Sequence, residues 1–361
     1  MSNHNNASLP LVTIITPSYN QVAFLEYTIQ SVFLQDYPRL EYMVVDGGSN
    51  DGSVDIIRKY ADRLAWWVSE RDKGQGDAIN KGLERAQGEI VAWLNSDDLY
   101  LPGAISGAVK ALQAHPEVGL VFGDALTIDA QGNPLNILTF DDWGLEELLS
   151  FRIICQPAVF MRRGVLQKAG FLDKSYHFML DHHLWLRMAS LAAVKYVPEI
   201  WAAARQHGWA KNVNQAVGFA LETHRLWEWI KTEPKLGPLA MQNWQQVEGG
   251  VYRLEARYLL DGGAPWPALK TYLQALFIRP GYTLKHWHRM VYAVLVILGL
   301  GKSADRLVKR YFQWRADRQR ERLMASVYSR VPATAQSGDW PGLAGQKLSL
   351  KGSNIVTNVT N

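Results

Sequence analysis

Several aspartates stand where an apolar run of the sequence stops. Asp46 closes the run that begins at Leu40, and the pair Asp97 and Asp98 follows the run that begins at Ile90. Apolar, β-branched runs of this kind predict buried parallel strands, whose carboxyl ends open into the crevice where α/β sheets bind ligands. Carboxylates gathered at that edge indicate a divalent cation that bridges a phosphate-containing ligand.

A second group of polar residues follows a glycine-rich segment at 73–76. Asp77, Asn80 and Lys81 are three and four residues apart, so they share one face of a predicted helix over 76–86. A solvated helix face is the alternative to a ligand-binding one. The glycines match neither a P-loop nor a dinucleotide fingerprint, which argues against NTPases and dehydrogenases.

Two further groups lie later in the chain. Asp181 opens a predicted helix over 181–192, where the helix dipole stabilises a carboxylate whatever its function. Arg205, His207 and Lys211 follow the last predicted strand, and basic side chains there suit a diphosphate. A solvated loop explains these three residues equally well.

The elements that must position these residues alternate between strands and helices. Apolar runs predict strands at 11–16, 40–45, 66–69 and 89–94, with helices between them and another from Pro102 to His115, which is a βαβ architecture. After residue 117 the regular alternation ends, and strands at 118–123, 153–161 and 194–204 predict a mixed sheet with antiparallel edges. From about Val213 the sequence is helical and rich in tryptophan.

Four segments closely resemble the nucleotide-sugar-binding domain of family 2 glycosyltransferases, which have the GT-A fold. They occur in a fixed order: Thr13-Ile-Ile-Thr-Pro-Ser-Tyr-Asn20, Val44-Val-Asp-Gly-Gly-Ser-Asn-Asp-Gly-Ser53, Asp72-Lys-Gly-Gln-Gly-Asp-Ala-Ile-Asn-Lys-Gly82 and Asn95-Ser-Asp-Asp98. The resemblance continues through Gln156-Pro157 and Asp181-His-His-Leu-Trp185, and it covers roughly residues 10–215. It implies an α/β fold with a Rossmann-like nucleotide-binding half and a mixed sheet, followed here by an α-helical extension.

The resemblance also implies roles for the residues at the strand ends. Asp98 ligates a divalent metal, Mn²⁺ or Mg²⁺; Asp97 lies against the ribose; Asp46 accepts a hydrogen bond from the base. The face of Asp77, Asn80 and Lys81 lies against the nucleotide sugar. The remaining nucleotide contacts are expected from the first loop, at Thr16, Pro17, Ser18, Tyr19 and Asn20.

By the same resemblance Asp181 is the catalytic base of an inverting transfer. It takes the proton from the acceptor hydroxyl while that oxygen attacks the anomeric carbon. Gln156, His182 and Trp185 are expected near the sugar or the acceptor, and His207 is expected as a second metal or phosphate contact. The residue before Asp181 is Leu180, where many members of the family carry glutamate.

These residues predict transfer of a sugar from a UDP-, dTDP- or GDP-sugar to a glycan or a lipid-linked acceptor, in polysaccharide or cell-surface glycan synthesis. The Gln-x-x-Arg-Trp motif and the membrane spans of processive members are absent, so we expect one sugar per encounter. Two alternatives remain: a non-catalytic binding protein on a decayed GT-A fold, and a nucleotidyltransferase. Nucleic acid is not an expected partner, because no recognition motif accompanies the basic residues.

The 361 residues are enough for one catalytic domain and an appendage. We expect a flexible N-terminus (1–9), a glycosyltransferase domain (10–215), a helical region (216–328) and a disordered tail (329–361). The single cysteine, Cys155, excludes an intrachain disulfide, and no signal or transmembrane segment is evident, so we expect a cytoplasmic protein. Between Lys285 and Arg330 eleven Lys and Arg stand against three acidic residues. This basic helical stretch predicts either peripheral contact with the inner face of the membrane or a helix packed on the catalytic domain.

Overall fold

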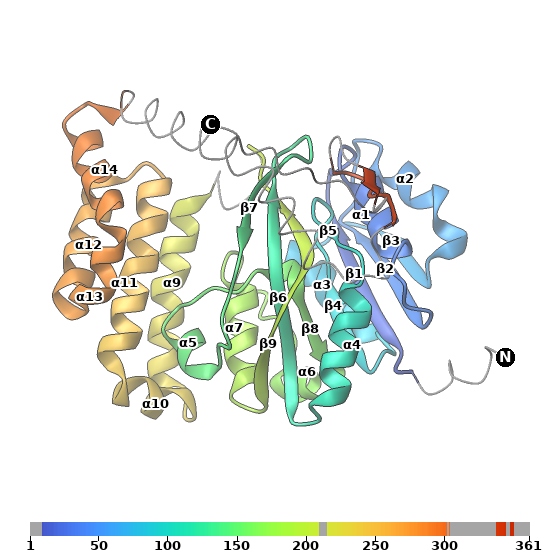
Figure 1. The fold of residues 1–361 in the computed structure, drawn as a ribbon, viewed down its shortest axis with the longest axis horizontal. Coiled ribbons are helices and arrows are strands. Elements are labelled where there is room, and N and C mark those ends of the chain that lie inside the picture. The colour runs from blue at the N-terminus through green and yellow to red at the C-terminus, as the bar shows by residue number, and fades with distance from the viewer. Residues whose placement is uncertain (1–8, 209–214, 302, 304–336, 344–346, 350–361) are drawn as a thin grey trace, which may run out of the picture.

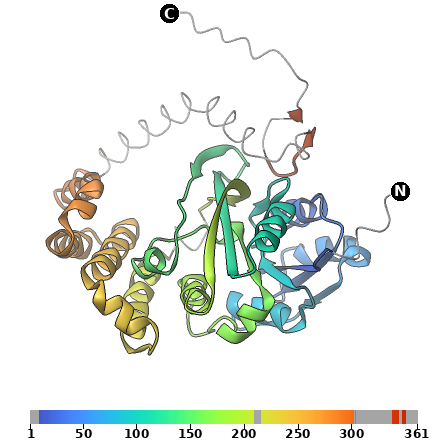
Figure 2. The same ribbon diagram turned by 60° about the horizontal axis from the view of Figure 1, so that its bottom comes forward.

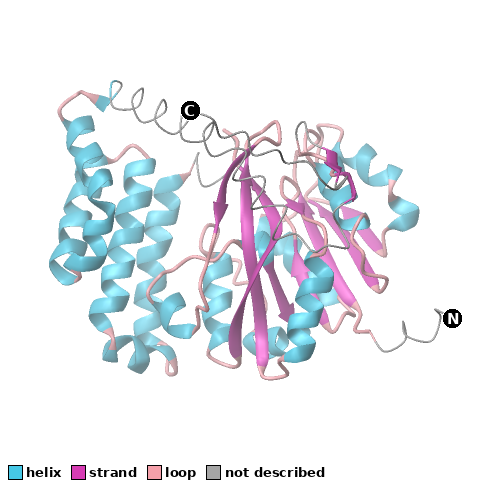
Figure 3. Ribbon diagram, in the orientation of Figure 1, coloured by secondary structure: helices cyan, strands magenta, loops and turns pink. Residues whose placement is uncertain are grey.

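The computed structural model describes residues 9–208, 215–301, 303, 337–343 and 347–349. Most of the chain forms one curled nine-stranded sheet flanked by helices, and a stack of helices lies at one end of the sheet (Figure 1). Figure 3 separates the two parts by colour, with strands in the sheet and helices alone in the stack. This arrangement confirms the predicted α/β domain with a helical C-terminal region.

The first part of the sheet is parallel, as the alternating pattern predicts. Strands run in the order β3-β2-β1-β4 and pair in parallel. The elements are β1 (Val12–Ser18), α1 (Leu25–Phe33), β2 (Leu40–Asp46), α2 (Ser53–Lys59), β3 (Trp66–Ser69), α3 (Gln75–Arg85) and β4 (Ile90–Trp93). The ends of β1, β2 and β4 therefore meet at one edge, where the first loop, Asp46 and the Asp97–Asp98 pair converge.

The second part of the sheet is mixed. Strand β8 is antiparallel to both of its neighbours, β4 and β6, whereas β6 and β9 are parallel, β5 is antiparallel to β9, and β7 pairs with β6 in antiparallel fashion. The elements are β5 (Leu99–Tyr100), α4 (Ala104–Ala114), β6 (Val118–Ile128), β7 (Pro134–Leu138), α5 (Leu145–Leu149), β8 (Val159–Arg162), α6 (Arg163–Ala169), α7 (Leu180–Ala189) and β9 (Ala193–Arg205).

One predicted strand is shorter than expected. The apolar run 153–161 forms a strand only from Val159, because Gln156–Ala158 is a 3-10 turn. Pro157 lies in that turn and has no backbone N–H to give to a strand ladder. The turn places Gln156 beside the end of β4 instead of within the sheet.

Successive residues of the central strands alternate between two hydrophobic cores, one on each face of the sheet. Ile15 and Trp93 belong to one cluster, and Ile14 and Ala92 belong to the other. Both faces are covered, which explains why β1 is buried at every position. Side chains of α9 and α11 join the first cluster, so the helical region shares a core with the sheet.

The helical region packs against the sheet through close backbone contact, and Figure 2 shows its helices stacked beside α5. A Cβ at Gly250 would lie 1.9 Å from the carbonyl oxygen of Ser150, so only glycine permits this approach. The elements are α9 (Ala216–Thr232), α10 (Leu236–Gln242), α11 (Trp244–Asp261), α12 (Pro265–Ile278), α13 (Pro280–Thr283) and α14 (Trp287–Ile297). Within the described residues, no helix has both the length and the apolar character needed to cross a bilayer.

Part of the tail that we expected to be disordered is ordered in the structure. Strands β10 (Ser337–Asp339) and β11 (Lys347–Ser349) form an antiparallel pair. The Trp340 indole donates a hydrogen bond of 2.7 Å to the carbonyl oxygen of Tyr100. The contact of Trp340 with the sheet corrects the prediction for residues 337–343. The rest of the predicted tail, apart from 347–349, and residues 1–8 of the predicted flexible N-terminus (1–9) lie outside the described residues.

Candidate active site

Asp97 and Asp98, which follow β4, are held by the backbone and side chain of Arg205. Asp98 is buried, and its Oδ1 accepts a hydrogen bond of 2.9 Å from the Arg205 backbone N–H. The Arg205 Nε donates to the Asp97 carbonyl oxygen at 2.9 Å. Burial, and then the negative charge of Asp97, raise the pKa of Asp98 well above its ordinary value. A cation close to Asp98 would relieve this electrostatic cost.

His207 contacts Asp97 rather than Asp98. Its Nε2 lies 3.0 Å from Oδ2 of Asp97, and its ring packs on Phe24 at 4.9 Å. No three His, Cys, Asp or Glu side chains of the described chain gather into a metal-binding cluster. The protein therefore offers carboxylate oxygens of one or two residues, which suits a hard cation whose shell is completed by phosphate oxygens and water.

A chain of amide side chains lines the same strand end. Gln75 Nε2 donates to Asn95 Oδ1 at 2.7 Å, and Asn95 Nδ2 donates to Gln156 Oε1 at 3.1 Å. Gln156 Nε2 in turn donates to the Trp93 carbonyl oxygen at 2.8 Å. The structure thus brings Gln156 to the end of β4 and joins it to two amides, Gln75 and Asn95, whose roles the sequence did not reveal.

The Asp46 carboxylate is occupied by its own loop. Its Oδ2 accepts hydrogen bonds from the backbone N–H groups of Gly48 (3.0 Å) and Ser49 (2.8 Å) and from the Ser69 hydroxyl (2.7 Å). Its Oδ1 accepts another from the Ser49 hydroxyl at 2.5 Å, and the residue is fully buried. Gly48 supports this loop with a φ of 83°, which glycine adopts without strain. The contact between Asp46 and the base stays a prediction, and Oδ1 has a single donor in this arrangement.

The first loop divides into a buried and an exposed half. Thr16 is buried with its hydroxyl 2.9 Å from the Tyr42 hydroxyl, and Pro17 and Ser18 are also buried in β1. Tyr19 is 62% exposed, and the neighbouring Asn20 accepts a hydrogen bond of 3.0 Å from the Asn50 N–H. The nucleotide contacts expected of these five residues stay predictions.

On helix α3, Asp77 and Lys81 take part in ion pairs, whereas Asn80 makes hydrogen bonds to the backbone. The Asp77 carboxylate lies 3.0 Å from Lys174 Nζ and 3.9 Å from Lys81 Nζ. Asn80 instead donates to the Leu172 carbonyl oxygen at 2.8 Å and accepts from the Leu172 N–H at 3.0 Å. Asn80 therefore joins α3 to the loop before α7, and its contact with the nucleotide stays a prediction.

Asp181 stands in the first turn of α7 with few partners. Its Oδ1 accepts a hydrogen bond of 2.7 Å from the His182 N–H, and burial raises its pKa to about 6. The loop before it is held by Glu222 of α9, which accepts from the N–H groups of 177, 178 and 179 at 2.7 to 2.8 Å. Glu222 is a buried acid of α9, and its charge alone did not predict this role.

His182 and Trp185 are buried, and their contact with the acceptor stays a prediction. His182 is buried, its Nε2 lies 3.0 Å from the Leu148 carbonyl oxygen, and burial lowers its pKa to about 4. Trp185 stacks on Trp93 with ring centroids 5.2 Å apart. Both side chains pack α7 against the rest of the domain.

The Cys155 thiol is affected by the charges of both candidate carboxylates, Asp98 and Asp181. Burial, then the charges of Asp98 and of Asp181, raise the pKa of its thiol, so both carboxylates lie within electrostatic range of one side chain. This arrangement suits a displacement in which one end of the reaction gains negative charge and the other releases a proton.

Comparison with known proteins agrees with this geometry. Residues 13–168 match the model of the family described as glycosyl transferase family 2. A PGL/p-HBAD biosynthesis glycosyltransferase of Mycobacterium bovis is 30% identical over 209 residues, which are 56% of this chain and 80% of that protein. An uncharacterized glycosyltransferase of Rickettsia typhi is 29% identical over 231 residues, or 62% of this chain and 72% of the relative.

Solved structures share the fold. The mannosyltransferase PcManGT from Pyrobaculum calidifontis, in complex with GDP-Man and Mn²⁺, has a TM-score of 0.57 and 21% identity, with 82% of this chain and 88% of that chain covered. S. aureus TarS 1-349 in complex with UDP-GlcNAc has a TM-score of 0.51 and 15% identity, with 80% and 92% covered. At these identities the likeness establishes the fold. The matches favour neither a nucleotidyltransferase nor a non-catalytic protein.

Proposed function

Because the chain belongs to glycosyl transferase family 2 and is a glycosyltransferase, we propose that it transfers one sugar from a nucleoside-diphosphate sugar to a hydroxyl of a glycan or lipid-linked acceptor, with inversion. The observation that carries this proposal is the pair of carboxylates with a raised pKa, the buried Asp98 and the partly buried Asp181, which both act electrostatically on Cys155. A polysaccharide or cell-surface glycan is the product class that we propose.

Asp98 would hold a divalent cation, Mn²⁺ or Mg²⁺, with Asp97 beside it. Such a cation supplies neutralisation of the charge that develops on the diphosphate leaving group. The donor set fits this role: Asp98 Oδ2 has only a contact of 3.3 Å from Asn95, and the buried carboxyl pair favours added positive charge. His207, at 3.0 Å from Asp97, would orient that carboxylate. The neighbour in complex with Mn²⁺ supports the choice of cation.

Asp181 would act as the general base. A pKa of about 6 leaves it ionised at neutral pH yet basic enough to accept a proton from an acceptor hydroxyl in the transition state. Glu222 and Asn80 would keep Asp181 in place, because they fix the backbone on the two sides of the loop before α7. Tyr19, Asn20, Asp77 and Lys81 would contact the donor, with the uracil, thymine or guanine base against the exposed Tyr19 ring.

The experiment that tests the proposal has two stages. A thermal-shift screen of UDP-, dTDP- and GDP-sugars with manganese identifies the donor, because a ligand that binds the folded state raises the melting temperature. Release of nucleoside diphosphate is then compared between the wild type and Asp98→Ala. A variant that releases it at the wild-type rate contradicts the metal assignment, and retention of the anomeric configuration in the product contradicts inversion.

We also propose peripheral contact of the outer face of the helical region with an anionic membrane. Large apolar side chains are exposed on this face, among them Phe277 (91% exposed), Trp266, Trp287 and Leu298, and Lys285 lies close to them in sequence. Aromatic and apolar groups with a nearby cation are typical of interfacial helices.

Co-sedimentation with phosphatidylglycerol vesicles should fall for the Phe277→Ser, Trp287→Ser double variant. Absence of wild-type binding at low salt would end this hypothesis. The more distal basic residues, from Lys302 on, lie outside the described residues.

A further inference from the structure

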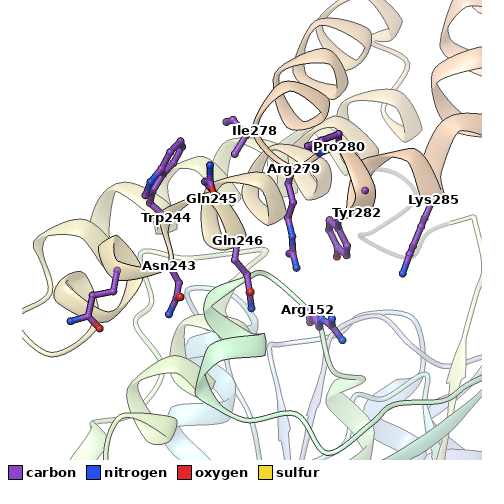
Figure 4. A pocket seen from close by; sticks show the side chains of 12 residues that line it. Arg152, Asn243, Trp244, Gln245, Gln246, Ile278, Arg279, Pro280, Tyr282 and Lys285 are labelled. Atoms are coloured by element: carbon purple, nitrogen blue, oxygen red, sulfur yellow. The ribbon is translucent and has the colours of Figure 1, made fainter.

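A cavity of about 630 Å³ lies where the helical region meets Arg152, in the segment that follows α5. Its wall contains three cationic side chains, Arg152, Arg279 and Lys285, and two aromatic ones, Trp244 and Tyr282. Figure 4 shows Arg279 and Lys285 reaching down from the helices toward Arg152 on the opposite wall. None of the twelve lining residues is acidic.

The cations of the cavity differ from the other cations of the same helices. Arg257 and Arg289 both lie near Asp261, with N to O distances of 3.6 and 2.8 Å. Among the described residues, by contrast, no carboxylate lies within 4.0 Å of the charged nitrogens of Arg152, Arg279 or Lys285. Converging cations repel one another, so their placement around one hollow is unfavourable unless an anion enters.

A fourth cation lies behind the cavity wall. Arg253 is 8% exposed, its Nη2 donates to the Phe151 carbonyl oxygen at 2.9 Å, and its Nε is buried without a hydrogen-bond partner. Its guanidinium lies 5.7 Å from the ring of Tyr282, which lines the cavity. A buried charge with no counter-ion is costly, and burial lowers the pKa of this arginine. An anion in the adjacent cavity would reduce that cost.

The remaining wall is suited to a sugar. Helix α11 has 18 residues and begins at Trp244, so its positive dipole end also faces the cavity. The exposed Trp244 ring offers a flat apolar face, the Tyr282 ring holds the Arg279 guanidinium 4.5 Å from its centre, and Gln246 offers amide donors and acceptors. Flat rings beside hydrogen-bonding amides are what a pyranose requires, whereas a purely inorganic anion needs only the cations.

We propose that this cavity binds a phosphate-bearing sugar of the acceptor, at a distance from the transfer site; the inference rests on the proposed function. Arg253 precedes Tyr258 on α11 by five residues, about 7.5 Å along a helix. Tyr258, whose pKa is raised by burial and to a smaller extent by Asp181, lies on the same helix. The cavity would thus hold a charged unit of the acceptor away from the hydroxyl that reacts.

The binding test uses glucose 1-phosphate, sn-glycerol 3-phosphate and glucose as probes, by calorimetry, with UDP and manganese saturating the donor site. We expect glucose 1-phosphate to bind the wild type, glycerol phosphate to bind more weakly and glucose not to bind. The Arg279→Gln, Lys285→Gln double variant should bind glucose 1-phosphate at least tenfold more weakly. Lys270→Gln is the matched control, because Lys270 is an exposed cation of α12 outside the cavity, and it should leave the affinity unchanged.

Three results would overturn the proposal: equal affinity in the wild type and the double variant, equal binding of glucose and its phosphate, or binding to phosphatidylglycerol vesicles without binding to soluble sugar phosphate. The last result would assign the phosphate to a lipid headgroup instead. Nucleoside diphosphate release from the donor serves as the separate readout. It should be unchanged in the double variant, whereas a wild type that releases none contradicts the proposed function and not this site.

Discussion

Asp46 at the end of β2 and Asp181 in the first turn of α7 have opposite surroundings: Asp46 is fully buried, whereas Asp181 is only partly buried. Asp46 accepts four hydrogen bonds from its own loop and from Ser69. Asp181 accepts one, from the His182 N–H, and burial raises its pKa to about 6. The contrast teaches that a buried carboxylate rich in donors organises the backbone, whereas one poor in donors is prepared to exchange a proton.

The strongest test of this contrast is Asp181→Asn. The amide keeps the shape of the side chain but accepts no proton, so we expect transfer to fall by about 10³-fold, within the range that general bases contribute. Donor affinity, measured by titration with the nucleotide sugar and manganese, should stay within about twofold, since a base acts after binding. Asp55→Asn, on the exposed face of α2, is the control and should retain full activity. Transfer above a tenth of the wild-type rate would show that another group takes the proton.

The matching test for the other aspartate is a stability measurement on Asp46→Ala. The substitution leaves four donors without their acceptor, two of them backbone N–H groups. We expect the free energy of unfolding to fall by about 3 kcal/mol in urea titrations. Asp46→Asn retains one carbonyl oxygen and should lose less. A loss below about 1 kcal/mol for the alanine variant would mean that water replaces the carboxylate, and the contrast with Asp181 would weaken.

Asn80→Ala extends the comparison to an amide that the sequence assigned to the donor. Its two hydrogen bonds to the Leu172 backbone are buried, so their loss should cost about 2 kcal/mol of unfolding free energy. The donor KM should change little, because neither bond faces the first loop. A large rise in KM with unchanged stability would place Asn80 in the donor site.

The sequence predicted the strands well where apolar, β-branched residues fill both faces, as in β1 and β2. It predicted less where a contact over long sequence distance decides the structure. Trp340 is ordered because it reaches the Tyr100 carbonyl oxygen, 240 residues earlier in the chain. In the site, motif spacing located Asp98, Gln156 and Asp181 but did not reveal which side chains face inward. Thr16, Asn80 and Trp185 all lie inside the motifs, and their burial follows from the packing of neighbours that no local pattern specifies.

The pH dependence of transfer tests the Asp181 side of the comparison without a substitution. With a pKa of about 6 in the free enzyme, Asp181 is protonated below that pH and loses its capacity as a base. The kcat/KM should therefore be level above about pH 7 and fall tenfold per unit below about pH 6. Donor binding measured at each pH serves as the control for loss of ligand affinity. An inflection near pH 4 instead would indicate a base with the ordinary acidity of a carboxyl group.

The smallest effect is expected at Tyr19, where a substitution should weaken donor binding and leave stability almost unchanged, the reverse of what we expect at Asp46. Because its ring is 62% exposed, Tyr19→Ala should change the free energy of unfolding by less than about 0.5 kcal/mol. The same change should weaken donor binding about five- to tenfold, which corresponds to the roughly 1 kcal/mol of an aromatic stacking contact. Tyr19→Phe is the matched control, since it keeps the ring and should keep the affinity. An unchanged donor affinity in Tyr19→Ala would mean that the base does not bind at the first loop. Asp46 could then take the place of Tyr19 in binding the base only by breaking the hydrogen bonds that fix its own loop.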